Sequence, residues 1–255
     1  MNTYDHIDKT TEDKDTTLLY MSDMKLYTCQ AKVADIRKRE DGTVELYLDQ
    51  TIFYPQGGGQ PWDTGTLEII DSVHPNVIGE ILHVIEVRYA DGRVMHGTNS
   101  QLVPISIGDT VRCNIDTEKR ILNSRLHSAG HLIDMALKEM GKDWKPTKGY
   151  HFPNGPYVEY ATDVAEIDLE LIKDQLEKTC ANIIGRNIQT NITFDTSEDK
   201  GMTGPGGKPL RTVWYGDFGI QCGGTHVDQL SDIGACRIRK IKKEGNGIRV
   251  GYQVE

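Results

Sequence analysis

The sequence predicts an α+β protein in which a small N-terminal β-barrel is followed by an α+β domain with an antiparallel sheet. Three observations predict this fold. Residues 25–115 contain many short segments that alternate or are rich in β-branched and aromatic residues, without a helix, which is typical of a small barrel. From residue 116 apolar residues recur at helical spacing. Strand-like segments and one further helix follow, so we expect the second domain to span residues 116–255.

The first 24 residues are expected to form a flexible leader, because they carry no sustained apolar period and hold six acids against two bases. Strands are then predicted near residues 26–33 and 43–48, with the turn Glu-Asp-Gly at 40–42 between them. Further barrel strands are predicted near residues 66–70, 79–88 and 110–115.

Two helices are predicted in the second domain. Asp116 is a good N-cap for the first, and Gly141 is a natural residue just beyond its end. The second is amphipathic and runs from a cap at Asp168 to about Ile184. Strands are predicted around 150–160, 187–194, 210–215, 234–241 and 247–254, with a glycine- and proline-rich loop at 201–209.

The bulk composition places the chain among soluble globular proteins, since 37% of its 255 residues are hydrophobic and 26% are charged. No segment approaches the roughly 20 apolar residues that a membrane span needs, and the polar N-terminus is unlike a signal peptide. We therefore expect a cytoplasmic protein without a membrane partner. A monomer is the default expectation, although no feature of the sequence decides the oligomeric state.

The five cysteines are scattered and odd in number, which favours free thiols or a metal site over a disulfide framework. Cys29, Cys113 and Cys180 have apolar neighbours and are expected to fill core.

The net charge of −9 argues against general affinity for nucleic acid, but the charge is unevenly distributed. Residues 236–255 hold six bases against two acids. This basic C-terminal segment is compatible with local contact to one RNA. The solvated face of a surface strand explains the same charges equally well. The candidates for RNA contact are Arg237, Arg239, Lys242 and Lys243.

Two pairs of metal-ligating residues are separated by about 90 residues. His127 and His131 stand at i and i+4 of the predicted helix, so both imidazoles project from one face. Cys222 and His226 enclose a flexible Gly-Gly-Thr segment. Imidazole nitrogen and thiolate sulfur are ligands that zinc prefers, so we expect the four to share one Zn²⁺. A metalloprotease is excluded, because Ser128 stands where those enzymes carry a glutamate as general base.

A second unusual segment is Tyr-Pro-Gln-Gly-Gly-Gly-Gln-Pro at residues 54–61. Three consecutive glycines are costly to order and indicate a close backbone approach or positive φ angles. No Lys-Ser or Lys-Thr follows, so the segment is not a phosphate-binding P-loop. A tight turn between strands is the alternative explanation.

The glycine-rich run at 53–61 with Asp-Thr-Gly at 63–65, the histidine pair and the Cys-Gly-Gly-Thr-His motif together resemble the editing region of alanyl-tRNA synthetase. The resemblance extends over roughly residues 26–254 and is strongest to the free-standing AlaX family of trans-editing proteins, in the form with both lobes. The length leaves no room for an aminoacylation domain, so a full synthetase is not expected.

This resemblance implies hydrolysis of the ester that joins a wrong amino acid, chiefly serine and secondarily glycine, to tRNA(Ala). It also implies zinc on the four ligands named above. Many family members carry Thr where Gly130 stands, which leaves the preference between serine and glycine open; Ser128 is a replacement hydroxyl, although it points to another helix face. The residues expected to contact or select the substrate are Gly57, Gly58, Gly59, Gln60, Ser128, Gly130 and Thr225.

Two roles are open for the metal. It can activate a water molecule, or it can hold the α-amino group of the substrate, a role that thiolate ligation mildly favours. Alanine is smaller than serine, so discrimination by a contact to the hydroxyl is expected rather than discrimination by size. The alternatives are a non-catalytic, zinc-stabilised tRNA-binding module and an editing hydrolase for Ser-tRNA(Thr). A general hydrolase of small esters is more distant.

Overall fold

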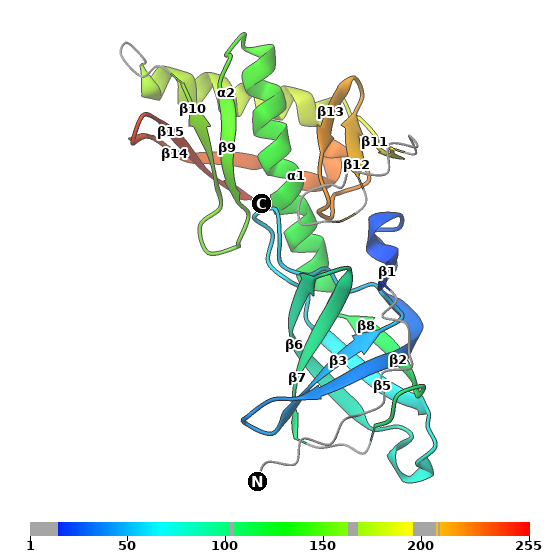
Figure 1. Ribbon diagram of the computed structural model, residues 1–255. Helices are drawn as coiled ribbons and strands as arrows, with labels where there is room; N and C mark the ends of the chain where they lie inside the picture. Colours follow the sequence, from blue (N-terminus) through cyan, green and yellow to red (C-terminus); the bar gives the residue numbers. More distant parts are fainter. Residues whose placement is uncertain (1–14, 102–104, 163–167, 196–207, 209) are drawn as a thin grey trace.

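The computed structural model describes residues 15–101, 105–162, 168–195, 208 and 210–255, and it confirms the α+β fold class (Figure 1). Six antiparallel strands close into a barrel in the order β2-β3-β7-β6-β5-β8. The barrel strands are β2 (Thr28–Lys38), β3 (Thr43–Leu48), β5 (Gly65–Asp71), β6 (Ile81–Ala90), β7 (Arg93–Gln101) and β8 (Thr110–Ile115).

Alternating side chains account for the barrel. Every second residue of β3 and of β8 is buried, as expected for strands with one face toward the barrel interior. The barrel closes where β2 pairs with β8, and Cys29 and Cys113 are directly opposite each other in that pair. The strand β7 was not predicted from the sequence, because its Gly, Thr, Asn and Ser residues weaken the apolar alternation.

A single long helix, α1 (Thr117–Glu139), leads from the barrel into the second lobe (Figure 1). As predicted, Asp116 caps it, accepting a hydrogen bond from the backbone N–H of Lys119 at 3.0 Å. Gly141 follows its end with a φ of +69°, the left-handed conformation that stops many helices. The second helix, α2 (Leu169–Gly185), is capped in the same way by Asp168.

Two antiparallel sheets complete the second lobe. One has the order β14-β15-β10-β9 and the other β11-β12-β13. Buried apolar residues of α1, α2 and both sheets form one core cluster there. The strands are β9 (Lys145–Tyr150), β10 (Tyr157–Ala161), β11 (Thr190–Phe194), β12 (Arg211–Tyr215), β13 (Phe218–Gln221), β14 (Cys236–Glu244) and β15 (Gly247–Val254). Short 3-10 helices lie at η2 (Pro75–Val77) and η4 (Leu230–Ile233).

The expected flexible leader is wrong for residues 15–24, while residues 1–14 lie outside the described part. β1 (Thr17–Leu18) pairs with β4 (Gln50–Thr51), and the 3-10 helix η1 (Leu19–Met21) follows it. Tyr20 is fully buried, with its ring edge-on to Tyr54 at 5.3 Å between centroids. The apolar run here is too short to show a period, so its burial depends on contacts distant in sequence.

A buried ion pair joins the barrel to α1. Arg120 bonds the carboxylate of Asp63, and both side chains are almost completely inaccessible to solvent. The same guanidinium donates to the carbonyl oxygens of Met24, at 2.9 Å, and Ile52, at 2.6 Å. These bonds fix the first turns of α1 against Met24 and the two residues that flank the glycine-rich segment, Ile52 and Asp63. The predicted division into domains at residues 24 and 115 stays a prediction.

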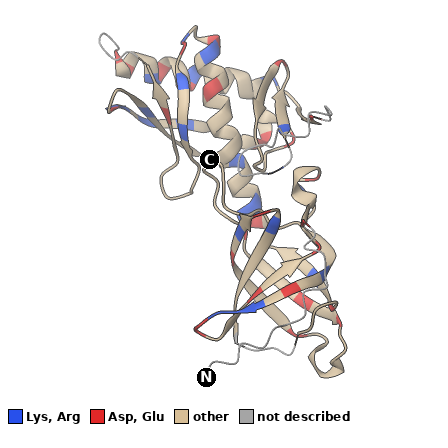
Figure 2. Ribbon diagram, viewed as in Figure 1, with Lys and Arg blue, Asp and Glu red and all other residues tan. Residues whose placement is uncertain are grey.

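Lysine and arginine are distributed over both lobes with acidic residues between them (Figure 2). Within the described ranges, no helix is long and apolar enough to cross a membrane.

Candidate metal centre and adjoining pocket

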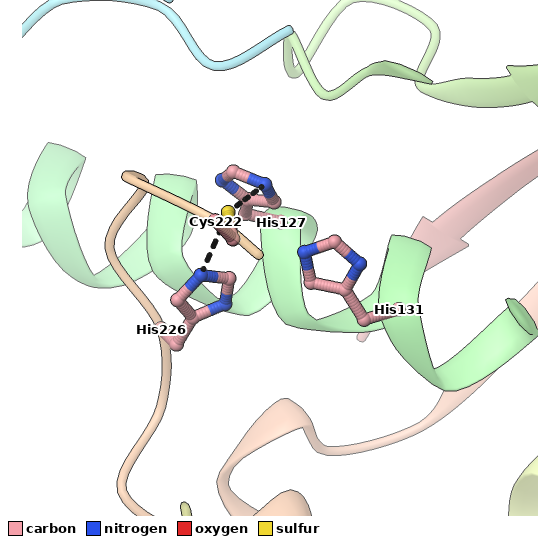
Figure 3. Close-up of side chains that lie close together, drawn as sticks. All are labelled: His127, His131, Cys222 and His226. Carbon is pink, nitrogen blue, oxygen red and sulfur yellow. Dashed lines mark hydrogen bonds between the residues drawn. The ribbon is translucent and has the colours of Figure 1, made fainter. Parts of the chain in front are cut away.

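The four predicted metal ligands lie together. His127 and His131 project from α1, and Cys222 and His226 lie in the loop that follows β13 (Figure 3). The ligand atoms of all four residues are within 4.8 Å of one another. The helix spacing places the first pair, and the folding of the β12–β13 hairpin beside α1 brings in the second.

His127 is oriented by the glycine-rich segment of the barrel. Its Nδ1 lies 2.8 Å from Oε1 of Gln60. The amide of Gln60 is itself fixed, since its Nε2 donates to Oγ1 of Thr225 and its Oε1 accepts from the backbone N–H of Thr225. An amide oxygen only accepts, so Nδ1 of His127 carries the proton and Nε2 keeps its lone pair. That Nε2 lies 3.4 Å from Sγ of Cys222.

His226 is oriented in the same manner. Its Nδ1 lies 3.0 Å from the hydroxyl of Tyr215 and 3.4 Å from Oγ of Ser128. The Tyr215 hydroxyl donates to Ser128, so the Tyr215 oxygen accepts from Nδ1 of His226. The opposite nitrogen, Nε2, is then free to face Sγ of Cys222 at 3.3 Å. Ser128 therefore supports a ligand from behind, and it does not line the pocket.

His131 has a buried nitrogen without a partner. Its Nδ1 lies 3.5 Å from Oδ2 of Asp134, whose acceptor character assigns the proton to Nδ1. Its Nε2 is inaccessible to solvent and, within the described part of the chain, has no hydrogen-bond partner. A buried polar atom left in this state is unfavourable unless something binds it, and here it belongs to the same four-atom cluster.

The ionisation of the cluster suits a metal ion. Burial is the main cause that holds the pKa of His127 and of His226 well below the ordinary value. Burial acts against the Cys222 thiolate, but the influence of the neighbouring His131 ring, together with the backbone N–H of Gly224, outweighs it and lowers the pKa of the thiol. Three imidazole nitrogens and one thiolate are a donor set that suits zinc, so these residues can hold such an ion.

A pocket of about 430 Å³ opens beside the cluster. Its wall combines the glycine-rich segment of the barrel, the inner face of α1, strand β9 and the Cys-Gly-Gly loop. The pocket therefore lies between the two lobes. The side chains with chemistry that border it include His127, His131, Asp134, His151, Lys208 and Cys222.

Three of the seven predicted substrate residues line this pocket, namely Gly57, Gly58 and Gly130. The structure places the other four behind its wall. Gln60, Ser128 and Thr225 are buried and hold ligands or the ligand loop. Gly59 forms part of the turn, with a φ of +77°, and its carbonyl accepts from the backbone N–H of His151 at 2.8 Å. A Cβ at Gly59 would lie 2.3 Å from the carbonyl oxygen of Gly149, so only glycine fits here.

Sequence reasoning missed three side chains around this site. Arg211, in β12, is buried and donates to the carbonyl oxygens of Cys222 and Gly224, which fixes the ligand loop. His151 follows β9 and stacks on His127, with ring centroids 4.5 Å apart. Neither belongs to a short motif, so no local sequence pattern indicates its role.

The third missed residue is Lys208. It is buried at the pocket wall, and burial lowers the pKa of its ammonium to about 8. Its Nζ lies over three tyrosine rings, at 5.6 Å from Tyr20, 4.9 Å from Tyr54 and 5.5 Å from Tyr89. Within the described ranges no carboxylate pairs with it.

The four predicted RNA contacts lie on β14 and do not border the pocket. Arg237 pairs with Glu177 and Glu255, and Lys242 pairs with Glu244. Arg239 donates to two backbone carbonyl oxygens, and Lys243 is exposed. Their role in binding RNA stays a prediction.

Comparison with known proteins identifies the relatives of this chain. The family model for the tRNA synthetases class II (A) matches residues 2–119. The alanine–tRNA ligase of Halobacterium salinarum is 30% identical over 248 residues, which cover 92% of this chain and 25% of the ligase. The alanyl-tRNA editing protein AlaX-L of Pyrococcus horikoshii is 28% identical over 252 residues, which cover 90% of this chain and 55% of that protein. The chain is a relative of alanyl-tRNA ligases and of AlaX-L.

The resemblance to alanyl-tRNA editing proteins is thereby confirmed over nearly the whole chain. The alanine–tRNA ligase of Methanobrevibacter smithii shows the same relation, with 29% identity over 92% of this chain and 26% of the ligase. The chain thus spans about a quarter of the ligases it matches and 55% of AlaX-L.

Proposed function

We propose that this protein is a trans-editing hydrolase that deacylates mischarged tRNA(Ala), chiefly Ser-tRNA(Ala), with Gly-tRNA(Ala) as a second candidate. The observation that carries the proposal is the pocket between the lobes, which brings the four-ligand cluster next to the glycine-rich segment in a relative of AlaX-L. An aminoacyl ester is already reactive, so hydrolysis needs positioning and charge stabilisation more than a strong nucleophile.

We propose Zn²⁺ as the metal, held by His127, His131, Cys222 and His226. When bound, zinc supplies a Lewis acid that can polarise water or anchor an amino group. The protein's own contribution is orientation: Gln60 and Tyr215 fix two of the imidazoles in the tautomer that leaves Nε2 available.

The remaining pocket residues suit the RNA end of the substrate. The ammonium of Lys208 borders the pocket, and its buried position strengthens any interaction with an anion. We assign it to the phosphate of the terminal nucleotide. The wall formed by Gly57 and Gly58 has no side chains, so the backbone can approach the aminoacyl ribose closely.

The test is a deacylation assay on Ser-tRNA(Ala), Gly-tRNA(Ala), Ala-tRNA(Ala) and Ser-tRNA(Thr), with the metal-loaded wild type and a His127→Ala/His131→Ala variant. The expected result is fast release from Ser-tRNA(Ala), slow release from Ala-tRNA(Ala), and loss of activity in the variant. Release only from Ser-tRNA(Thr) would assign the other editing specificity. No release from any charged tRNA, with tRNA binding retained, would favour a non-catalytic binding module.

A further inference from the structure

His151 occupies a space that two glycines leave open. It follows β9 and lies in the pocket wall against His127. A Cβ on Gly130 would lie 2.5 Å from Cε1 of His151, and a Cβ on Gly149 would lie 2.6 Å from its Nε2. Any larger residue at either position would displace the ring. Gly130 is therefore the position that makes room for an imidazole beside the metal cluster.

The hydrogen bonds of His151 fix its tautomer. Its Nδ1 lies 2.6 Å from the hydroxyl of Tyr252, and that hydroxyl donates its one proton to the carbonyl oxygen of Leu126 at 2.9 Å. The phenol oxygen must then accept from the histidine, so Nδ1 carries the proton. A neutral ring protonated at Nδ1 presents a lone pair at Nε2.

Among the described residues, the ring of His151 is hydrogen bonded through Nδ1 alone, and the residue borders the pocket, so Nε2 is an acceptor open to a ligand there. His151 is 4% exposed, and it is not one of the four residues whose ligand atoms converge. The bond to Tyr252 accounts for Nδ1, so Nε2 is the ring nitrogen that remains available to a ligand in the pocket.

We propose that Nε2 of His151 accepts a hydrogen bond from the side-chain hydroxyl of the seryl group and thereby selects serine. This inference rests on the proposed function and extends it to a residue that determines specificity. Alanine and glycine have no hydroxyl, so neither can donate a hydrogen bond to this acceptor. A site built to bond a hydroxyl rejects analogues that lack it far better than a site that measures size. The predicted order of preference is serine well ahead of glycine and alanine.

The first experiment compares kcat/KM for Ser-tRNA(Ala) and Gly-tRNA(Ala) in wild type and His151→Phe, which keeps the ring and removes the acceptor. Losing one buried hydrogen bond corresponds to about a tenfold to hundredfold fall on the seryl substrate. The glycyl rate should change far less, so the serine preference collapses. A His151→Phe protein that keeps the wild-type preference, or loses both rates equally, would overturn the proposal.

A binding experiment separates this proposal from the proposed function. The probes are 3′-seryl and 3′-alanyl amides of 3′-amino-3′-deoxyadenosine, which are not readily hydrolysed. Wild type should bind the seryl amide more tightly, and His151→Phe should bind both alike. This outcome would support the role of His151 even if no charged tRNA is deacylated; equal wild-type affinities would refute it even if deacylation occurs.

Two controls accompany these experiments. The metal content and melting temperature of His151→Phe show whether the fold and the neighbouring cluster are intact. Tyr252→Phe removes the partner of Nδ1 while keeping Nε2, so it should reduce the serine preference less than His151→Phe does. A larger loss in Tyr252→Phe, with metal content unchanged, would contradict the assignment of Nε2 as the contacting atom.

Discussion

Oε1 of Gln60 lies 2.8 Å from Nδ1 of His127, although the two residues are 67 positions apart and belong to different lobes. Gln60 directly follows the three glycines of the glycine-rich segment, and His127 stands on the inner face of α1. The bond makes the barrel part of the metal centre, because it sets the tautomer of a ligand.

Replacing Gln60 with Leu should weaken metal binding by about tenfold to a hundredfold, the effect typical of losing a group that orients a ligand. The measurement is competition with a chelator of known affinity. Gln56→Leu, on the same segment, is the matched control, because Gln56 bonds Arg88 and no ligand. Equal metal affinity in wild type and Gln60→Leu would show that the histidine orients itself without the barrel.

Removing one ligand should abolish stoichiometric metal binding. His131→Ala eliminates the buried Nε2 that has no partner within the described residues. We expect purified wild type to retain one metal ion after dialysis and His131→Ala to retain far less, as measured by elemental analysis. His74→Ala is the control, since His74 is exposed in the barrel lobe. Retention of a full equivalent by His131→Ala would exclude it from the ligand set.

Removing one partner of the buried pair Asp63–Arg120 should strongly destabilise the protein, because the other charge would stay buried without a partner. Asp63→Ala leaves the Arg120 guanidinium buried without its carboxylate, which costs about 3–5 kcal/mol in the free energy of unfolding. Urea unfolding measures the loss. Glu68→Ala is the control; it breaks the partly exposed pair with Arg112 and should cost at most about 1 kcal/mol. Similar decreases in the free energy of unfolding of the two variants would mean that the buried pair does not stabilise the contact between α1 and the barrel.

Features that depend on residues close together in the sequence could be predicted, whereas features that depend on distant residues could not. His127 and His131 are local partners on one helix, and capping by Asp116 is local too, so both could be predicted from spacing alone. Five of the six barrel strands were predicted from alternation, and β7 was missed because its alternation is weak. By contrast, the burial of Tyr20 depends on Tyr54, a contact across 34 positions that no local period reveals.

The pocket illustrates the same limit. The family resemblance indicated a missing hydroxyl at Gly130, but only the folded structure shows that the ring of His151, which follows β9, takes that space. Ser128, considered as a replacement hydroxyl, instead bonds Tyr215 and the backbone of Val227. The positions of His151 and Ser128 both depend on contacts between elements distant in the sequence, and a single sequence gives no indication of such contacts.

Lys208 provides a pH-dependent prediction. Burial lowers the pKa of its ammonium to about 8, from an ordinary 10.5, so the folded protein loses this charge as the pH rises through about 8. If the ammonium binds the terminal phosphate, affinity for the 3′ end of an uncharged tRNA should fall between about pH 7 and 9. Fluorescence anisotropy with a labelled 3′-terminal RNA measures this.

Lys208→Met should bind weakly and without the pH step, whereas Lys148→Met, at another lysine of the pocket wall, should keep the step. The free energy of unfolding should change with pH in the opposite direction to the RNA affinity. The unfolded chain holds the Lys208 proton up to 10.5 while the folded chain releases it near 8, so the free energy of unfolding should rise with pH in that window relative to Lys208→Met. A wild-type affinity that stays constant from pH 7 to 9, alongside this rise in stability, would show that Lys208 is buried for packing and does not hold the RNA.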